Sequence, residues 1–174
     1  MKSILLSIAA VLAIVSLAHA EDITVKITKI HMCCGSCEKG VTNACKDIDG
    51  LKAVASKETK TVELTAPDKA TVQKGVDALV KAGYFGKCDD SDIKFDTTTG
   101  AKGDKVQTLK VEGIHLCCPK CVKAVNLALK DVPGYTTNDA VKNAQFVVIT
   151  GDFKDSDVMD ALQKHGLTGK VTAQ

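Results

Sequence analysis

The chain has 174 residues, of which 45% are hydrophobic and 25% charged, and its formal net charge is only +2. Its 23 basic residues are all lysines, aromatic residues make up 3% of the chain, and tryptophan is absent. Nucleic-acid-binding surfaces rely on basic stripes or on aromatic platforms for base stacking. This composition therefore predicts no nucleic-acid partner. The length suits one medium domain or two small ones.

The first 20 residues have the pattern of a secretory signal peptide. Lys2 gives a positive start, residues 4–17 are largely apolar, and Ala18-His19-Ala20 places small residues around a cleavage point. The apolar run is shorter than the ~20 residues that a membrane-spanning helix needs. We therefore predict cleavage after Ala20, export to the periplasm or the extracellular space, and no membrane association afterwards. An uncleaved N-terminal anchor is the alternative.

The next 70 or so residues predict a βαββαβ unit. Apolar and polar residues alternate over residues 23–27, as in a half-buried strand. A cysteine-rich loop follows, then a helical pattern that stops at Asp49-Gly50. Residues 51–56 and 60–65 form a hairpin pattern, Pro67-Asp68 opens a second helix that Gly83 ends, and a last strand is expected near Tyr84.

The sequence contains two copies of this unit as an internal repeat. A shift of 84 residues superimposes the first cysteine loop on a second one, with the apolar pattern in register on both sides. The organisation predicted is a signal peptide at residues 1–20, a first domain at 21–90, a linker at 91–105 and a second domain at 106–174. The linker would let the domains move relative to each other. Each domain is expected to be ferredoxin-like α+β, a four-stranded antiparallel sheet with both helices on one face. The superimposed loop residues are His31 on His115, Cys33 on Cys117, Cys34 on Cys118 and Cys37 on Cys121.

Six of the eight cysteines lie in the two loops. A disulfide framework would spread cysteines along the chain, so this clustering favours sites, although a disulfide within each C-x-x-C pair remains an alternative. Both pairs precede a predicted helix, whose N-terminal N–H groups and dipole favour thiolates. Soft thiolates select Cu(I), Hg(II), Cd(II) or Zn(II). The candidate metal ligands are Cys34, Cys37, Cys118 and Cys121, with Cys33, Cys117, His31 and His115 as possible additions.

The first loop, Met32-Cys33-Cys34-Gly35-Ser36-Cys37, resembles the M-x-C-x-x-C loop of the heavy-metal-associated domain. That domain occurs in copper chaperones, copper-transporting ATPases and periplasmic mercuric-ion-binding proteins. The resemblance spans residues 23–88 and 106–171 and implies the same ferredoxin-like fold. It also implies that each C-x-x-C pair holds Cu(I), or else Hg(II), and passes it to a docking protein by thiolate exchange.

Both copies depart from the family pattern. The family usually has Gly before the Met and Thr after it, where this chain has His31 and Cys33; the second copy has Leu116 in place of the Met. An extra cysteine and histidine could raise the coordination number to three or four, which favours Zn(II) or Cd(II).

The sequence thus predicts a metal-binding and transfer protein with a metal donor or acceptor protein as partner, and no enzymatic activity. The alternative is a thiol–disulfide oxidoreductase that uses the same pairs, since C-x-x-C at a helix N-terminus is also a redox arrangement. The remaining cysteines, Cys45 and Cys88, match Leu129 and Val171 in the repeat and are expected to be small buried hydrophobic residues.

Overall fold

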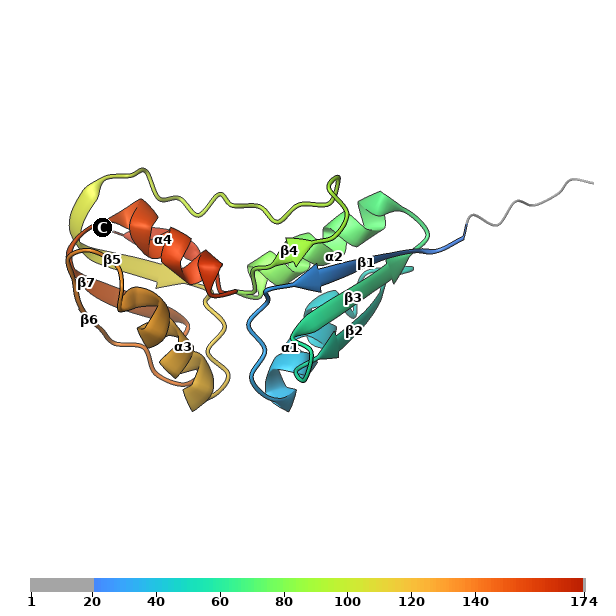
Figure 1. Cartoon of the computed structure of the whole chain (residues 1–174), viewed down its shortest axis with the longest axis horizontal. Helices are drawn as coiled ribbons and strands as arrows, with labels where there is room; N and C mark the ends of the chain where they lie inside the picture. Colours follow the sequence, from blue (N-terminus) through green and yellow to red (C-terminus); the bar gives the residue numbers. More distant parts are fainter. Residues whose placement is uncertain (1–20, 174) are drawn as a thin grey trace, which may run out of the picture.

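A computed structural model describes residues 21–173. The predicted signal peptide lies outside these described residues. The chain folds into two βαββαβ units, one after the other (Figure 1). The first comprises β1 (Ile23–Thr28), α1 (Gly35–Cys45), β2 (Lys52–Ser56), β3 (Thr61–Ala66), α2 (Lys69–Lys81) and β4 (Lys87–Cys88). The second comprises β5 (Lys105–Glu112), α3 (Pro119–Leu129), β6 (Tyr135–Asn138), β7 (Phe146–Lys154), α4 (Asp155–Lys164) and β8 (Lys170–Ala173).

Each unit contains one four-stranded sheet, and the two sheets share one topology. The strand orders are β2-β3-β1-β4 and β6-β7-β5-β8. All paired strands are antiparallel. In each unit the two helices pack against each other, and α1, α2 and α4 also contact strands of their sheets. These are two ferredoxin-like α+β domains, which confirms the predicted fold class.

The alternation predicted for the strands builds the core. In β1, Val25 and Ile27 are buried, while Thr24 and Lys26 are exposed. In α2, the buried Val72, Val76 and Leu79 form one stripe of the helix. Asp68 caps this helix, since its carboxylate accepts a hydrogen bond of 2.7 Å from the Thr71 N–H. The pattern is least accurate at the edge strand β4, which is short and begins at Lys87 rather than near Tyr84.

The segment between the domains is tied to both of them. Its Ile93 and Phe95 side chains are buried, although neither lies in a strand. On the first domain, the Lys94 N–H donates to the Gln73 side chain at 3.0 Å, and the Phe95 ring packs against Phe85. The Thr99 carbonyl accepts a hydrogen bond of 2.7 Å from the Val171 N–H of β8. The buried carboxylate of Asp155 at the start of α4 accepts hydrogen bonds from the N–H groups of residues 102 and 103, at 2.8 and 2.7 Å.

The two domains also contact each other directly, which the linker pattern did not predict. Tyr84 and Leu167, equivalent in the repeat, pair in an antiparallel bridge. The Phe85 N–H donates to the Gly166 carbonyl and the Thr168 N–H donates to the Gly83 carbonyl, both at 3.1 Å. These hydrogen bonds are reciprocal, so the domains are related locally by an approximate two-fold axis, as the subunits of an isologous dimer are.

Glycine is required at this interface. Gly83 and Gly166 both have positive φ, at 83° and 78°. A Cβ on Gly83 would lie 2.2 Å from the Gly113 carbonyl oxygen, and a Cβ on Gly166 would lie 2.5 Å from the backbone of His31. The close approach brings the loop after β1 and the loop after β5 side by side at the lower centre of the molecule (Figure 1).

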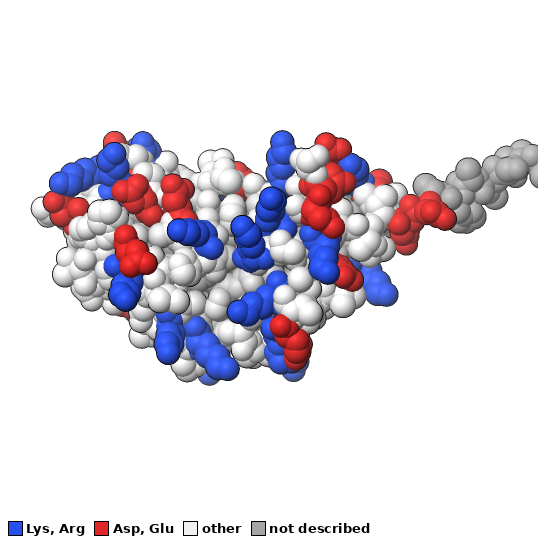
Figure 2. Space-filling model, in the orientation of Figure 1, with Lys and Arg blue, Asp and Glu red and all other residues white. Residues whose placement is uncertain are grey.

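The surface carries charges of both signs. Lysine and acidic side chains are interleaved over the face drawn in Figure 2, and several lysines gather at its lower edge. The exposed Lys39 belongs to α1, and the exposed Lys120 and Lys123 belong to α3. Within residues 21–173 the structure contains no helix of the length and apolarity that a membrane span requires.

Candidate metal centre

Each cysteine loop is fixed by the strand before it and the helix after it. Met32 and Leu116 are buried and anchor the two loops in the core. Cys34 and Cys118 occupy the N-cap positions of α1 and α3 in extended conformation. Cys37 and Cys121 lie in the first turns, where their N–H groups donate to the carbonyls of the N-cap cysteines at 3.0 Å. This arrangement turns both sulfurs of each pair to the same side.

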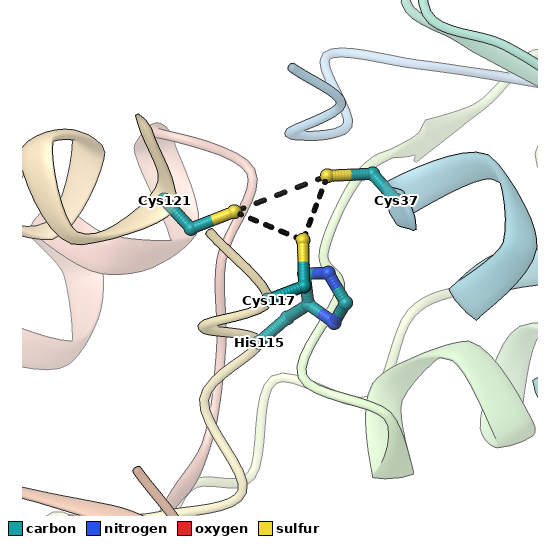
Figure 3. Close-up of side chains that lie close together, drawn as sticks. All are labelled: Cys37, His115, Cys117 and Cys121. Carbon is teal, nitrogen blue, oxygen red and sulfur yellow. Dashed lines mark hydrogen bonds between the residues drawn. The ribbon is translucent and has the colours of Figure 1, made fainter. Parts of the chain in front are cut away.

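The two loops face each other, and their six sulfurs converge on one place. Within the pairs, the Sγ atoms of Cys34 and Cys37 are 3.8 Å apart, as are those of Cys118 and Cys121. Distances between the loops are equally short: 3.4 Å from Cys33 to Cys118, 3.5 Å from Cys37 to Cys117 and 3.6 Å from Cys33 to Cys121. The structure thus brings the predicted ligands of both copies together in one centre. Figure 3 shows the sulfurs of Cys37, Cys117 and Cys121 at the corners of a triangle.

The centre is largely enclosed but open on part of its surface. Cys37 and Cys121 are completely buried, with 0% exposure, because they lie between the loops and the helices. The other four cysteines are partly exposed. A bound ion would thus be shielded on the protein side and reachable from solvent through the outer sulfurs.

His115 is held by Tyr84. The two rings stack with centroids 4.4 Å apart, and the His115 Nε2 lies 3.1 Å from the Tyr84 hydroxyl. That hydroxyl donates its hydrogen to the Cys37 carbonyl at 2.9 Å, so His115 is the donor in the other bond and carries its proton on Nε2. The Nδ1 lone pair of this tautomer is free to act as a ligand. A ring nitrogen of His115 and the sulfurs of Cys37, Cys117 and Cys121 all lie within 4.8 Å of one another.

His31 occupies the equivalent position in the first copy but has different contacts. Its Nε2 is buried and has no hydrogen-bond partner among the described residues. A ring nitrogen of His31 groups with the sulfurs of Cys33 and Cys121 within 4.8 Å. Burial lowers the pKa of His31, which favours the neutral imidazole that binds metals.

The thiols influence one another's ionisation. Hydrogen bonding from the Cys121 thiol lowers the pKa of Cys37, and the same interaction raises the pKa of Cys121, because two thiolates at this distance repel. Burial opposes the ionisation of Cys118, but the N–H groups at the start of α3 and the Cys33 thiol outweigh it and lower its pKa to about 7. Burial raises the pKa of Cys33 to about 12.

The two remaining cysteines stand apart from this centre. Cys45 is buried in the first core, where its thiol approaches the Gly75 carbonyl at 3.9 Å. Cys88 is half-buried at the end of β4. Burial raises the pKa of both thiols to about 11, so both are protonated near neutral pH. Cys45 is therefore the small buried hydrophobic residue that the sequence predicted. Cys88 agrees with that prediction only in part, because it is half-buried.

Comparison with known proteins assigns the chain to no family. No protein-family model matches it. No curated protein matches it either. Among solved structures, the N-terminal soluble domains of Bacillus subtilis CopA align over 88% of this chain and 95% of theirs, with 17% identity and a TM-score of 0.31. The first two RRM domains of yeast poly(U)-binding protein Pub1 align over 87% and 100%, with 13% identity and a TM-score of 0.29. Likeness at this level assigns neither protein's function to this chain.

The predicted site residues group differently in the structure than in the sequence prediction. The sequence pattern predicted Cys34, Cys37, Cys118 and Cys121 as the main ligands, one C-x-x-C pair in each copy. In the structure, the sulfurs of Cys33 and Cys117 lie as close to the other four as the pairs do to each other. The repetition of histidine and a third cysteine in both loops was the available signal for their inclusion. That the described Cys and His side chains could hold a metal ion follows from this proximity.

Proposed function

We propose that this chain is an exported protein that binds soft metal ions as cargo, Cu(I) above all, and passes them to a partner protein. The observation that carries the proposal is the convergence of six cysteine sulfurs and two histidines from both loops. The N–H groups and dipoles at the two helix N-termini stabilise thiolates, which prefer soft cations over hard ones.

The coordination preferences of the ions support Cu(I) as the preferred cargo. Six thiolates in a partly enclosed site repel one another, and each bound cation relieves that repulsion. Cu(I) accepts sulfur ligands in low coordination numbers and can share them between ions, whereas Zn(II) is satisfied by four ligands in a tetrahedron. Hg(II), Cd(II) and Zn(II) are alternative cargoes for the same sulfurs.

Transfer by ligand exchange is supported by the exposed part of the centre. Cys34 and Cys118 are partly exposed at the helix starts, so an incoming thiolate can reach a metal bound to them. The exposed Lys39, Lys120 and Lys123 nearby would steer an acidic partner. The M-x-C-x-x-C resemblance of the first loop supports the same mode of action, and the export signal pattern supports a role outside the cytoplasm.

Metal uptake by the reduced protein tests this function. Anaerobic chain lacking the signal peptide would be titrated with Cu(I), Hg(II), Cd(II) and Zn(II) against competing chelators. We expect tight Cu(I) binding that is lost when all six loop cysteines are changed to Ser. Cys45→Ala is the matched control and should bind as the unmodified protein does. Absence of uptake, together with insulin reduction that persists in the presence of chelator, would replace this function with the thiol–disulfide oxidoreductase.

A further inference from the structure

The distances among the six sulfurs also indicate how bound ions would be coordinated. Each of the six sulfurs lies 3.4–3.9 Å from three or four others. Several sets of three are close in all their mutual distances, and these triangles share sulfurs. Cys37, Cys117 and Cys121 form one triangle with sides of 3.5, 3.7 and 3.9 Å. Cys33, Cys118 and Cys121 form another, with sides of 3.4, 3.6 and 3.8 Å.

These separations fit three- or four-coordinate ions rather than linear ones. With a metal–thiolate bond of about 2.3 Å, sulfurs lie about 4.6 Å apart across a linear ion, about 4.0 Å around a trigonal one and about 3.8 Å around a tetrahedral one. Even the C-x-x-C partners are only 3.8 Å apart. A pair of independent two-coordinate ions, one in each loop, therefore does not match the geometry.

Sharing of sulfurs between triangles requires bridging thiolates. Cys121 belongs to both triangles described above, and Cys37 also forms a triangle with Cys34 and Cys117, with sides of 3.8, 3.8 and 3.5 Å. Ions seated in triangles that share a corner are joined through that sulfur. A fourth triangle joins Cys33, Cys37 and Cys121, with sides of 3.6, 3.7 and 3.9 Å. One three-coordinate ion in each of the four triangles gives about four ions.

Charge and the histidines support the same arrangement. Two Cu(I) ions would leave six half-buried thiolates with a large excess of negative charge, whereas about four would remove most of it. The buried Nε2 of His31, beside Cys33 and Cys121, has no hydrogen-bond partner among residues 21–173, and a buried polar atom of this kind usually has a partner of some sort. A metal ion or a bridging thiolate at the edge of the cluster would supply one.

We infer that the six loop cysteines hold one thiolate-bridged cluster of about four Cu(I) ions that spans both domains. This inference rests on the proposed function, because it specifies the form in which the cargo is held. It also assigns Cys33 and Cys117, which lie outside the C-x-x-C pairs, as full cluster ligands. Since every ion takes sulfurs from a shared set, the cluster forms as a unit, and partly filled states are less stable than the full one.

Native mass spectrometry of the reduced chain during Cu(I) titration, with copper X-ray absorption on the product, tests this inference. We expect the metal-free chain to convert to a species with about four Cu(I) ions, with little intermediate loading, sulfur in the first shell and copper–copper scattering beyond it. Saturation at one or two ions without copper–copper scattering would overturn the cluster and leave the proposed function standing. No Cu(I) uptake would overturn both.

A variant separates the cluster from independent pairs. Cys33→Ser together with Cys117→Ser leaves both C-x-x-C pairs intact and removes two bridging sulfurs. The cluster account predicts loss of the species with about four ions and loss of copper–copper scattering. Retention of the wild-type stoichiometry in this variant would overturn the inference. Cys45→Ala, which removes a thiol outside the centre, should leave the stoichiometry and the scattering unchanged.

Discussion

Tyr84 and Leu167 occupy equivalent positions in the two copies of the repeat, and they pair with each other in an antiparallel bridge at the domain interface. Pairing of equivalent residues in opposite directions requires a local two-fold axis between them. The same axis relates the cysteine loops, so contacts come in matched sets, such as Cys33 with Cys121 at 3.6 Å and Cys117 with Cys37 at 3.5 Å. The chain thus reproduces within one molecule the interface of a symmetric dimer.

The interface glycines give the first prediction. Gly83→Ala should destabilise the contact between the domains, because its Cβ would meet the Gly113 carbonyl oxygen at 2.2 Å and because φ is +83°. Gly103→Ala is a matched control: its φ is also +83°, but a Cβ there meets nothing within 4 Å. The control should lose about 1 kcal/mol from backbone strain. Gly83→Ala should lose more in denaturant unfolding and should also bind Cu(I) more weakly. Equal losses in the two variants would contradict the role given to this contact.

Removal of the Tyr84 hydroxyl gives the second prediction. Tyr84→Phe loses the hydrogen bonds to the Cys37 carbonyl and to His115, and should cost about 1 kcal/mol of stability. It should also speed the removal of bound Cu(I) by a competing chelator, because Cys37 and His115 lose a common support. Tyr135→Phe is the control, since that hydroxyl bonds Asn138 away from the centre at 2.6 Å. A comparable change in the removal rate in both variants would argue against a specific effect of Tyr84 on the site.

The third prediction concerns the segment between the domains. Asp155→Ala should cost about 2–3 kcal/mol, because it leaves two backbone N–H groups without their carboxylate acceptor. Hydrogen exchange should become faster at residues 102 and 103. Asp157 lies in the same first turn of α4 and is only partly buried, so Asp157→Ala should have a much smaller effect. Unchanged exchange at these two amides in Asp155→Ala would show that the segment is held by other contacts.

The N-cap of α2 gives a prediction for pH. The Thr71 N–H bonds the Asp68 carboxylate and lowers its pKa below the ordinary value. A carboxylate whose pKa is lowered on folding stabilises the protein above the unfolded pKa of about 4, and this contribution is lost as pH falls through the folded value. The stability difference between the unmodified chain and Asp68→Ala should therefore be largest near neutral pH and shrink below about pH 4. A difference that stays constant down to about pH 2 would contradict the carboxylate's role.

Sequence and structure agree where local patterns decide the result. Period-two alternation in residues 23–27 and the helical stripe at Val72, Val76 and Leu79 fixed the elements, and the repeat transferred them to the second domain. The start of β4 depended on pairing with β1 and so escaped the local pattern. The shared cysteine cluster depended on how the two domains pack. Its determinants are backbone contacts at Gly83 and Gly166, which no side-chain periodicity encodes.

The histidines show the same division. Their repetition at His31 and His115 was visible in the sequence, and their place beside the cysteines was therefore predictable. The difference between the contacts of the two histidines was not predictable. Tyr84 supports His115, whereas its counterpart Leu167 has no hydroxyl with which to support His31, and the His31 Nε2 has no partner among the described residues. The two loops thus supply equivalent cysteines, but their histidines have different contacts.

Cu(I) binding by a chain with one disabled cysteine loop tests most directly whether the two loops form one centre or two independent sites. Cys33, Cys34 and Cys37 would all be changed to Ser, and bound Cu(I) would be counted by native mass spectrometry while affinity is measured against a chelator. A shared centre predicts that the second loop alone binds fewer than half as many ions, at least ~10-fold more weakly, because its ions lose sulfurs from the first loop. Retention of half the ions at undiminished affinity would contradict the account.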